Sequence, residues 1–484
     1  MTDSDAPAHD GDPPDGGGSP IGGDLPDDGD PPTDGGDLPD DQPDLLDSAR
    51  RLLASGPVCD HCLGRPFADR SFGLGNDERG RGLRTAVALA DDEDFDSPDP
   101  AACWVCEGVF QRLSSFTDEA VDTVADHEFE TYQVGTRVPG LLAENDRLLR
   151  EDAGLDPEAG EPLRKELNRE LGKRIGARTD TEVDFDRPDV QFLLDLEADE
   201  VEATVNSAFV YGRYRKLERD IPQTEWPCSD CDGTGRDAGG PCPACDGTGY
   251  RYPESVEQLT APVVEDVMDG VDSAFHGAGR EDVDARMLGT GRPFVVEVAE
   301  PRRRTVDTER LEADIDAFAE GRVAVDGLRL CRYEMVERVK ELDASKRYRA
   351  EVVFAEPVDS DALDDAAAAL SGTTVEQYTP TRVDHRRASK TRERTAYEVT
   401  ASLAEDDPTR ATVEIHGEGG LYVKELVSSD DGRTEPSLAG ELGVGAEVAA
   451  LDVLAVTGEE EPFEREALFR DDRDVTRATG EVDG

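Results

Sequence analysis

A short cysteine-rich segment carries a strong signal for metal chemistry. Two Cys-x-x-Cys pairs, each followed by Asp-Gly-Thr-Gly, are separated by ten residues. Thiolate pairs on tight glycine turns can close a tetrahedral sulfur site around Zn²⁺, with bonds of about 2.3 Å. Four thiolates leave no open coordination position, so this metal would be structural; the alternative is a set of reduced surface cysteines. The candidate ligands are Cys228, Cys231, Cys242 and Cys245.

Two further Cys-x-x-Cys pairs lie forty residues apart in the N-terminal half. Disulfide frameworks belong to small secreted domains, whereas this spacing in a long chain is more typical of metal binding. The alternative is a set of buried structural cysteines. The candidate ligands are Cys59, Cys62, Cys103 and Cys106, with His61 as a substitute if one thiol is not used. The ninth cysteine, Cys331, has no such partner and is expected to be a small core residue.

A glycine-flanked loop between residues 277 and 294 combines carboxylates with arginines. Its sequence, GAGREDVDARMLGTGRPF, leads directly into an apolar strand candidate. Such a loop could hold a catalytic carboxylate that neighbouring cations keep ionised. A salt-bridged surface turn is the alternative explanation of the same residues. The charged side chains singled out are Arg280, Asp282, Asp284, Arg286 and Arg292.

Two later segments contribute a hydroxyl and an ammonium group. The sequence KRYRAEV places Tyr348 at the start of a strand, and GLYVKEL places Lys424 at the start of a helix. Taken singly, each is more often a packed tyrosine or a solvated lysine.

Between these segments lies the densest basic run of the chain. Guanidinium groups suit phosphate contacts, so a basic cluster in an acidic protein indicates a phosphate-bearing partner. A solvated charged loop is the alternative. The run contains Arg382, Arg386, Arg387, Lys390, Arg392 and Arg394.

The charge balance of the whole chain is strongly acidic. Its 484 residues include 112 acidic and 52 basic side chains, a formal net charge of -60, and only seven of the basic residues are lysine. Uniform acidity with few lysines is typical of adaptation to a salt-rich cytoplasm, where molar salt screens charges beyond about 3 Å. Net charge therefore does not exclude a nucleic-acid partner, and local arginine clusters are more informative.

The regions that must position these groups differ in composition and periodicity. The N-terminal region consists almost entirely of Asp, Gly and Pro. It cannot bury enough apolar surface to offset the conformational entropy that it would lose on becoming ordered. There is no apolar N-terminal h-region and no run of 18 apolar residues, so we expect a cytoplasmic protein without a membrane anchor. The expected regions are a disordered acidic tail (1–43), an α/β region (44–226), the cysteine module (227–250), a second α/β region (251–460) and a charged C-terminal tail (461–484).

Apolar periodicity predicts individual elements within both α/β regions. In the first region it predicts a helix over 164–175 and strands over 190–196 and 205–211. A basic and aromatic stretch follows the second of these strands. In the second region the strand candidates are Phe294–Val298, Tyr348–Phe354, Thr395–Leu403 and Ala411–Ile415.

Together these motifs resemble the archaeal tRNA pseudouridine synthases that modify positions 54 and 55 in the TΨC arm. The resemblance covers nearly everything from Cys59 to about Val456. It implies an α/β (α+β) protein, with a zinc-containing THUMP-type RNA-binding domain over 44–226 and a pseudouridine synthase domain with a curved mixed sheet over 251–460. The motifs that carry it are both cysteine sets, the stretch ending Ile-Pro-Gln-Thr at Thr224, Gly-Arg-Glu-Asp-Val-Asp, Lys-x-Tyr, Thr-Pro-x-Arg-Val-x-His-Arg-Arg and Gly-Leu-Tyr-Val-Lys.

The resemblance also implies roles for individual residues. Asp282 is expected to be the catalytic nucleophile and Lys424 to pair with it. Tyr348 is expected to stack on the target base and to act as a base, and Tyr422 to be a further substrate-side residue. The loop that grips the RNA is expected to use Arg382, Arg386 and Arg387.

Isomerising uridine breaks the C1′–N1 bond, rotates the base and joins C1′ to C5. The reaction is redox-neutral, so no catalytic cofactor is expected, and one or two zinc ions would be structural. The target must leave its stack and enter a pocket. Two routes stay open: attack of the carboxylate on C1′, or its assistance to deprotonation at C2′ by Tyr348. The expected partner is tRNA, modified at position 54, 55 or both, and a monomer is the expected state.

Two other classes of protein share some of these features. A THUMP-containing tRNA-binding or tRNA-methylating protein would need a glycine-rich cofactor loop after a strand, for which Gly73-Leu-Gly75 is a weak candidate. A chaperone-like zinc module would carry several Cys-x-x-Cys-x-Gly-x-Gly repeats and would not carry a loop of the Asp282 type.

Overall fold

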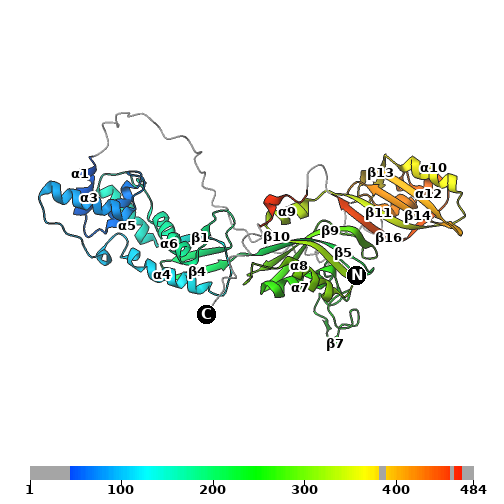
Figure 1. The fold of residues 1–484 in the computed structure, drawn as a ribbon, viewed down its shortest axis with the longest axis horizontal. Helices are drawn as coiled ribbons and strands as arrows, with labels where there is room; N and C mark the ends of the chain where they lie inside the picture. Colours follow the sequence, from blue (N-terminus) through cyan, green and yellow to red (C-terminus); the bar gives the residue numbers. More distant parts are fainter. Residues whose placement is uncertain (1–43, 381–388, 458–462, 471–484) are drawn as a thin grey trace, which may run out of the picture.

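The computed structural model describes residues 44–380, 389–457 and 463–470. Within these ranges the chain forms an elongated molecule with two parts, one at the left of Figure 1 and a longer one from the centre to the right. The first part contains the elements from Leu45 to Val205, and the second contains those from Ala208 onwards. The acidic segment over 1–43 lies outside the described residues.

The first part packs helices against a four-stranded sheet. Its helices are α1 (Leu45–Ala54), α2 (Asp60–Gly64), η1 (Arg65–Phe67), α3 (Asn76–Asp91), η2 (Pro100–Ala102), α4 (Val109–Thr123), α5 (Gly140–Asp152) and α6 (Leu163–Thr179). Its strands are β1 (Thr131–Arg137), β2 (Glu182–Val183), β3 (Val190–Asp195) and β4 (Glu200–Val205), in the order β2-β1-β3-β4. β1 is parallel to β2 and β3, whereas β4 is antiparallel to β3. Leu167, Leu171 and Ile175 recur every four residues along α6 and are buried in one core with Phe192 of β3.

A ten-stranded mixed sheet organises the described residues of the second part. Its order is β10-β5-β9-β16-β11-β14-β13-β12-β15, and β8 pairs with β9. β9 and β16, near the middle, are parallel and share only two paired positions. The strands are β5 (Ala208–Lys216), β8 (Asp272–Gly277), β9 (Arg286–Ala299), β10 (Val323–Cys331), β11 (Ser345–Phe354), β12 (Thr373–Tyr378), β13 (Thr391–Ala404), β14 (Asp407–Gly417), β15 (Thr434–Glu435) and β16 (Ala446–Thr457).

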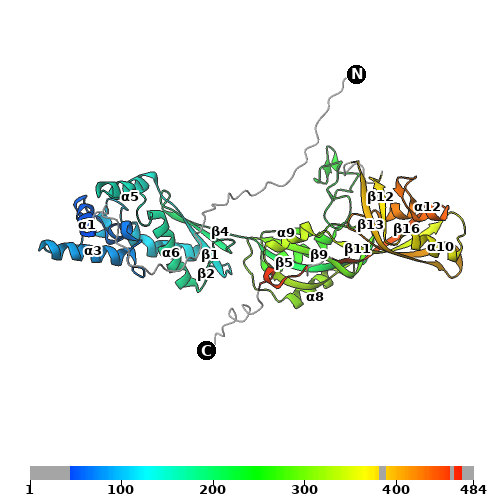
Figure 2. The ribbon, with the colours of Figure 1, turned by 90° about the horizontal axis from the view of Figure 1, so that it is seen from above.

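Helices cover this sheet in two groups, visible at its two ends in Figure 2. Their bounds are α7 (Val256–Met268), α8 (Thr308–Ala319), α9 (Glu334–Glu341), α10 (Ser360–Leu370), α11 (Val423–Ser428), α12 (Leu438–Leu442) and η4 (Glu466–Leu468). Successive side chains of β9 point to opposite faces. Val296 therefore shares a core with α7 and α8, whereas Val295 packs with residues of α9.

The boundary between the two parts differs from the one expected at residue 226. The strand predicted over 205–211 is in fact two strands, because β4 ends at Val205 and β5 begins at Ala208. β5 pairs with β9 and β10, so it belongs to the second sheet, and the cysteine module is an insertion between β5 and α7. Periodicity missed the length of β5 because its last four residues are basic or polar in sequence, although two of them, Tyr214 and Lys216, are buried in the structure.

Residues 463–470 join the two parts, although a charged tail was expected there. Phe469 is buried, with its ring centroid 5.6 Å from that of Tyr211. Arg470 forms an ion pair with Asp189 of the first part, and Arg304 of the second part lies 3.0 Å from the same carboxylate. Asp189 is 2% exposed, so this junction contains a desolvated ionic cluster.

The remaining predicted elements are confirmed. The helix over 164–175 lies within α6, the strand over 190–196 coincides with β3 to within one residue, and the strand candidates of the second region lie within β9, β11, β13 and β14. Cys331 is a buried core residue, as expected. Among the described residues, the structure contains no helix of the length and apolarity that crossing a membrane requires.

Candidate active site

A cleft of about 590 Å³ opens where β9 and β16 meet. Segments from distant parts of the chain line it: the approach to the cysteine module, the glycine-flanked loop, the start of β11, the start of α11 and the middle of β16. Three residues with predicted catalytic roles share this cleft, namely Asp282, Tyr348 and Lys424. Tyr422, the further substrate-side residue, lines it as well.

Lys424 joins two carboxylates of the glycine-flanked loop. Its Nζ lies 3.3 Å from Oδ2 of Asp282 and 2.8 Å from Oδ2 of Asp284. The side chain of Asp282 is 38% exposed and that of Asp284 is 63% exposed. Asp282 is therefore the more sheltered carboxylate, and a substrate in the cleft can reach it.

Tyr348, the fourth residue of β11, lines the floor of the same cleft. It is 9% exposed, and burial, together with the charge of Asp282, raises the pKa of its hydroxyl to about 12 although Arg292 opposes the shift. At neutral pH the tyrosine is therefore a neutral aromatic ring with a proton on its oxygen.

The segment before α11 is fixed by a side-chain amide. Gln377 accepts a hydrogen bond from the backbone N–H of Tyr422 (2.8 Å) and donates one to its carbonyl (2.9 Å). The hydroxyl of Tyr422 is buried and has no hydrogen-bond partner among the described residues. A buried polar atom without a partner at a cleft is a group that a bound substrate can satisfy.

A buried ionic cluster supports the glycine-flanked loop from below. Glu281 Oε2 lies 2.8 Å from Arg292 Nε and accepts a hydrogen bond from the Tyr214 hydroxyl at 2.9 Å. Lys216 Nζ lies 3.6 Å from Oε1 of the same carboxylate and donates to the carbonyls of Asp282 (3.3 Å) and Val283 (3.1 Å). The Glu281 and Lys216 side chains are fully buried, and this burial lowers the pKa of Lys216.

Sequence reasoning missed this cluster, although it had noted Arg292 and the basic stretch containing Lys216. The sequence pattern did not distinguish Glu281, because it is adjacent to Asp282 in a row of charged residues. Its neighbours belong to β5 and β9, and their contacts depend on strand pairing across the sheet.

A group of ion pairs centred on Asp452, the Asp452 clamp, holds the glycine-flanked loop on the side of β16. Asp452 of β16 accepts two hydrogen bonds from Arg286, at 2.9 and 2.6 Å, and one from Arg219 at 2.7 Å. Arg219 also donates to the carbonyl of Asp284 at 2.9 Å. Burial opposes ionisation of Asp452, but the two guanidinium groups outweigh it and lower its pKa. The clamp is therefore complete at neutral pH and is lost only as the pH falls through that lowered pKa.

Both cysteine sets form compact sulfur clusters. In each set the candidate ligand atoms lie within 4.8 Å of one another. The Sγ–Sγ distance is 3.7 Å for Cys59 with Cys106 and 3.8 Å for Cys231 with Cys245. A tetrahedron with Zn–S bonds of about 2.3 Å has S–S edges of about 3.8 Å, so both sets fit this metal.

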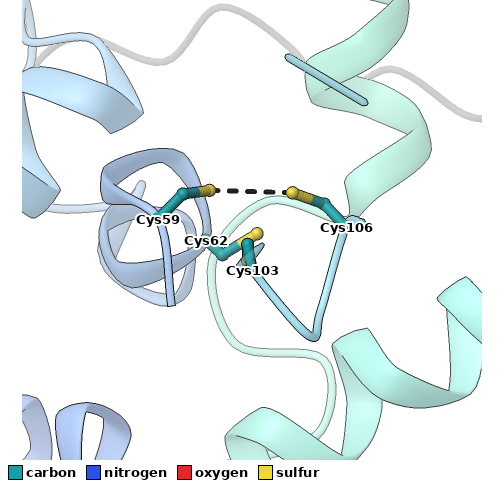
Figure 3. A group of neighbouring side chains, drawn as sticks. All are labelled: Cys59, Cys62, Cys103 and Cys106. Carbon is teal, nitrogen blue, oxygen red and sulfur yellow. Dashed lines mark hydrogen bonds between the residues drawn. The ribbon is translucent and has the colours of Figure 1, made fainter. Parts of the chain in front are cut away.

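The first cluster connects helices of the N-terminal part, and Figure 3 shows the sulfur atoms of Cys59 and Cys106 facing each other. Burial raises the pKa of the Cys62 thiol, so a cation is needed to keep it a thiolate. Arg65 donates to Cys62 Sγ at 3.5 Å. The substitute ligand His61 instead contacts Glu166, with its Nδ1 2.8 Å from Oε1.

The second cluster is organised by backbone groups of its glycine turns. The N–H of Gly249 donates to Cys245 Sγ at 3.2 Å. Burial opposes ionisation of Cys245, but this N–H and the neighbouring thiols lower its pKa to about 7. The turns favour a thiolate, which is the form that binds Zn²⁺.

Two other sequence candidates have different outcomes. Arg382, Arg386 and Arg387 lie outside the described residues, between the end of β12 at Tyr378 and the start of β13 at Thr391. The glycines at 73 and 75, the candidate cofactor loop, follow the 3-10 helix η1 and precede α3, whereas a cofactor loop would follow a strand.

Two family descriptions match the chain, and each range lies within one of its two parts. "Pus10, C-terminal" matches residues 209–457, and "Pus10 THUMP domain, archaeal" matches residues 116–195. The chain belongs to the Pus10 family. The first range begins within β5 and ends with β16, which supports the boundary at Asn206 and Ser207. As a member of this family, the chain is an isomerase of the pseudouridine synthase class.

Relatives within the Pus10 family align over most of the chain. The tRNA pseudouridine synthase Pus10 of Halorubrum lacusprofundi is 67% identical over 428 residues, which cover 88% of this chain and 100% of that protein. The protein of the same description from Methanothrix thermoacetophila is 42% identical, over 86% of this chain and 95% of its own length. A solved Cbf5-Nop10-Gar1 complex matches 42% of this chain and 46% of its own, at 16% identity and a TM-score of 0.27.

The Asp452 clamp generates a testable prediction. Replacing Asp452 with Asn removes the charge that holds Arg219 and Arg286, so the loop carrying Asp282 is no longer held in position. We expect kcat to fall about 10- to 100-fold with the fold retained, as for a small misplacement of a catalytic group. Initial rates of pseudouridine formation measure it.

Asp326→Asn is the matched control, because it removes an exposed ion pair with Arg215 (3.2 Å) on another part of the sheet. Its rate should equal that of the wild type. Wild-type kcat in the Asp452 variant would show that the clamp does not position the loop.

Proposed function

We propose that this cleft isomerises uridine to pseudouridine at position 54, position 55 or both in the TΨC arm of tRNA, with Asp282 as the nucleophile. The observation that carries the proposal is the pair of Asp282 and Lys424 beside the buried ring of Tyr348. The names of the aligned relatives support the substrate class. The THUMP match over 116–195 supports RNA binding by the first part.

In the proposed reaction the target uridine leaves its stack and enters the cleft. The carboxylate of Asp282 attacks C1′ and forms an ester as the C1′–N1 bond breaks, so the electron pair of that bond leaves with the base. The base rotates and C5 attacks C1′, which releases the carboxylate. The C5 proton then moves to N1. Atoms and electrons balance without an oxidant, a reductant or a cofactor.

The protonation state of Tyr348 favours attack of Asp282 on C1′ over deprotonation of C2′. Deprotonation of C2′ by Tyr348 needs the phenolate. With a pKa of about 12, the phenolate makes up about one part in 10⁵ at pH 7. We therefore assign Tyr348 the role of an aromatic face for the flipped base. Lys424 keeps Asp282 ionised when the substrate excludes water from the cleft.

We propose further that each cysteine set binds one structural Zn²⁺ and that tRNA contacts Arg382, Arg386 and Arg387. The sulfur spacing in both clusters supports the metals. The arginine contacts stay a prediction from the sequence. We expect the protein to act as a monomer in the cytoplasm.

Asp282→Asn tests the nucleophile. An amide cannot form the ester with C1′, so we expect pseudouridine formation to fall at least about 10⁴-fold, to the limit of the assay. Binding of tRNA should change less than about threefold, because one small cleft group contributes little of the RNA contact area. A position-resolved pseudouridine assay and a binding titration measure the two effects.

Asp284→Asn is the informative control, since Asp284 also contacts Lys424 but is the more exposed carboxylate. It should retain most of its turnover, because Asp282 keeps its lysine. Near-normal turnover in the Asp282 variant, or loss only in the Asp284 variant, would contradict the assignment.

The metal assignment predicts two Zn²⁺ per chain after extensive dialysis. Cys59→Ser and Cys228→Ser should each reduce the content to one, and chelation should lower the free energy of unfolding because structural zinc is linked to folding. Elemental analysis measures the content. A wild-type value of one, unchanged by Cys59→Ser and lost in Cys228→Ser, would leave the cysteine module as the metal site.

A further inference from the structure

The base of the cysteine module forms part of the wall of the catalytic cleft. Trp226 lines the cleft and lies two residues before the first zinc-ligand candidate, Cys228. The segments that enter and leave the module pair with each other. Pro227 forms a β-bridge with Tyr250, and the Arg251 N–H donates to the Trp226 carbonyl at 2.8 Å. The metal cluster and the cleft wall are therefore one continuous structure.

Aromatic rings and a cation gather at this base. The rings of Trp226 and Tyr252 meet edge to face, with centroids 5.4 Å apart. The guanidinium carbon of Arg251 lies 5.7 Å from the Trp226 ring and 5.9 Å from the Tyr252 ring. Arg251 is exposed and both rings are half-buried. Ring faces combined with an arginine are the groups that proteins use to hold unstacked nucleobases.

This aromatic group is also fixed relative to the catalytic loop. Gln223, three residues before Trp226, donates from one amide nitrogen to the carbonyl of Gly279 (2.8 Å) and to the hydroxyl of Tyr214 (2.9 Å). Glu257 of α7 accepts from the backbone N–H of Glu225 at 3.1 Å. The segment leading to Trp226 is thereby tied to the buried cluster beneath Asp282.

We propose that Trp226, supported by Tyr252 and Arg251, stacks on the nucleotide next to the flipped uridine, and that the cysteine module positions this stacking site. The inference rests on the proposed RNA substrate. Flipping one base removes a stacking partner from each neighbour, and an aromatic face at the cleft replaces it. The catalytic residues hold the target base, whereas Trp226 holds the base beside it.

The two tryptophans of the chain allow a direct test. Trp104 lies in the first part, between Cys103 and Cys106, with its ring beside Gly56: a Cβ at that glycine would lie 3.2 Å from the ring. The Trp104→Phe variant therefore leaves Trp226 as the single indole. Adding a TΨC-arm stem-loop RNA in molar KCl should quench its fluorescence, because a base stacked on an indole quenches the excited state. The same quenching should occur with Asp282→Asn also present, where RNA binds without turnover.

Steady-state kinetics supply the second readout. Trp226→Ala should raise KM for the stem-loop on the order of tenfold, within the range for losing one stacked base, and change kcat by less than about threefold. Trp226→Phe should recover part of the loss, and Trp104→Phe should leave KM unchanged. Zinc content measured on each variant shows whether the module is intact.

The outcomes separate this inference from the proposed function. If wild-type protein forms no pseudouridine in full-length tRNA or in the stem-loop, the proposed function fails. If wild-type protein is active but the Trp226 emission does not respond to RNA, the stacking site is wrong. An unchanged KM in Trp226→Ala overturns it equally. If Trp226→Ala loses zinc, the phenylalanine variant and the fluorescence titration decide between stacking and a purely structural role.

Discussion

The geometry of the cleft depends on one desolvated ionic cluster, in which Glu281 contacts Arg292 and Lys216. Removing charges from water is costly, and breaking such a cluster leaves an uncompensated buried charge. The chain therefore has one low-energy way to place Glu281, which is below the loop. Its neighbour Asp282 then faces the cleft, and Lys216 fixes the backbone carbonyl of Asp282 directly. The position of Asp282 in the cleft therefore follows from the burial of Glu281.

Salt adaptation and precise positioning are compatible because they use different kinds of ion pair. A net charge of -60 and many exposed pairs are strongly screened at molar salt. The pair beneath the catalytic loop is sheltered, because the side chains of Glu281 and Arg292 are at most 1% exposed. Screening by mobile ions acts weakly there. The two cysteine clusters add constraints that do not depend on surface charge, and the second of them continues into the cleft wall through Trp226.

The sequence alone identified the functional groups that lie within short motifs. The four Cys-x-x-Cys pairs are such motifs. The resemblance of two further motifs to a known family predicted the contact of Asp282 with Lys424, which are 142 residues apart. Sequence reasoning failed where the decisive partner comes from strand pairing. The length of β5, the role of Glu281 and the packing of Phe469 depend on neighbours in the sheet, which periodicity along one segment does not contain. The module at 227–250 was recognised as a unit, but its continuity with the cleft required the pairing of Pro227 with Tyr250.

A double-mutant cycle of Glu281→Gln, Arg292→Gln and both together, followed by denaturant unfolding in molar KCl, tests the dependence on this cluster most directly. Each single variant leaves a buried charge without its partner and should lose about 3–5 kcal/mol of unfolding free energy. The double variant removes both charges. It should therefore lose less than the sum of the single losses by at least about 1 kcal/mol, with recovery limited because Lys216 stays. Losses that add, or a Glu281→Gln variant as stable as the wild type, would contradict the account.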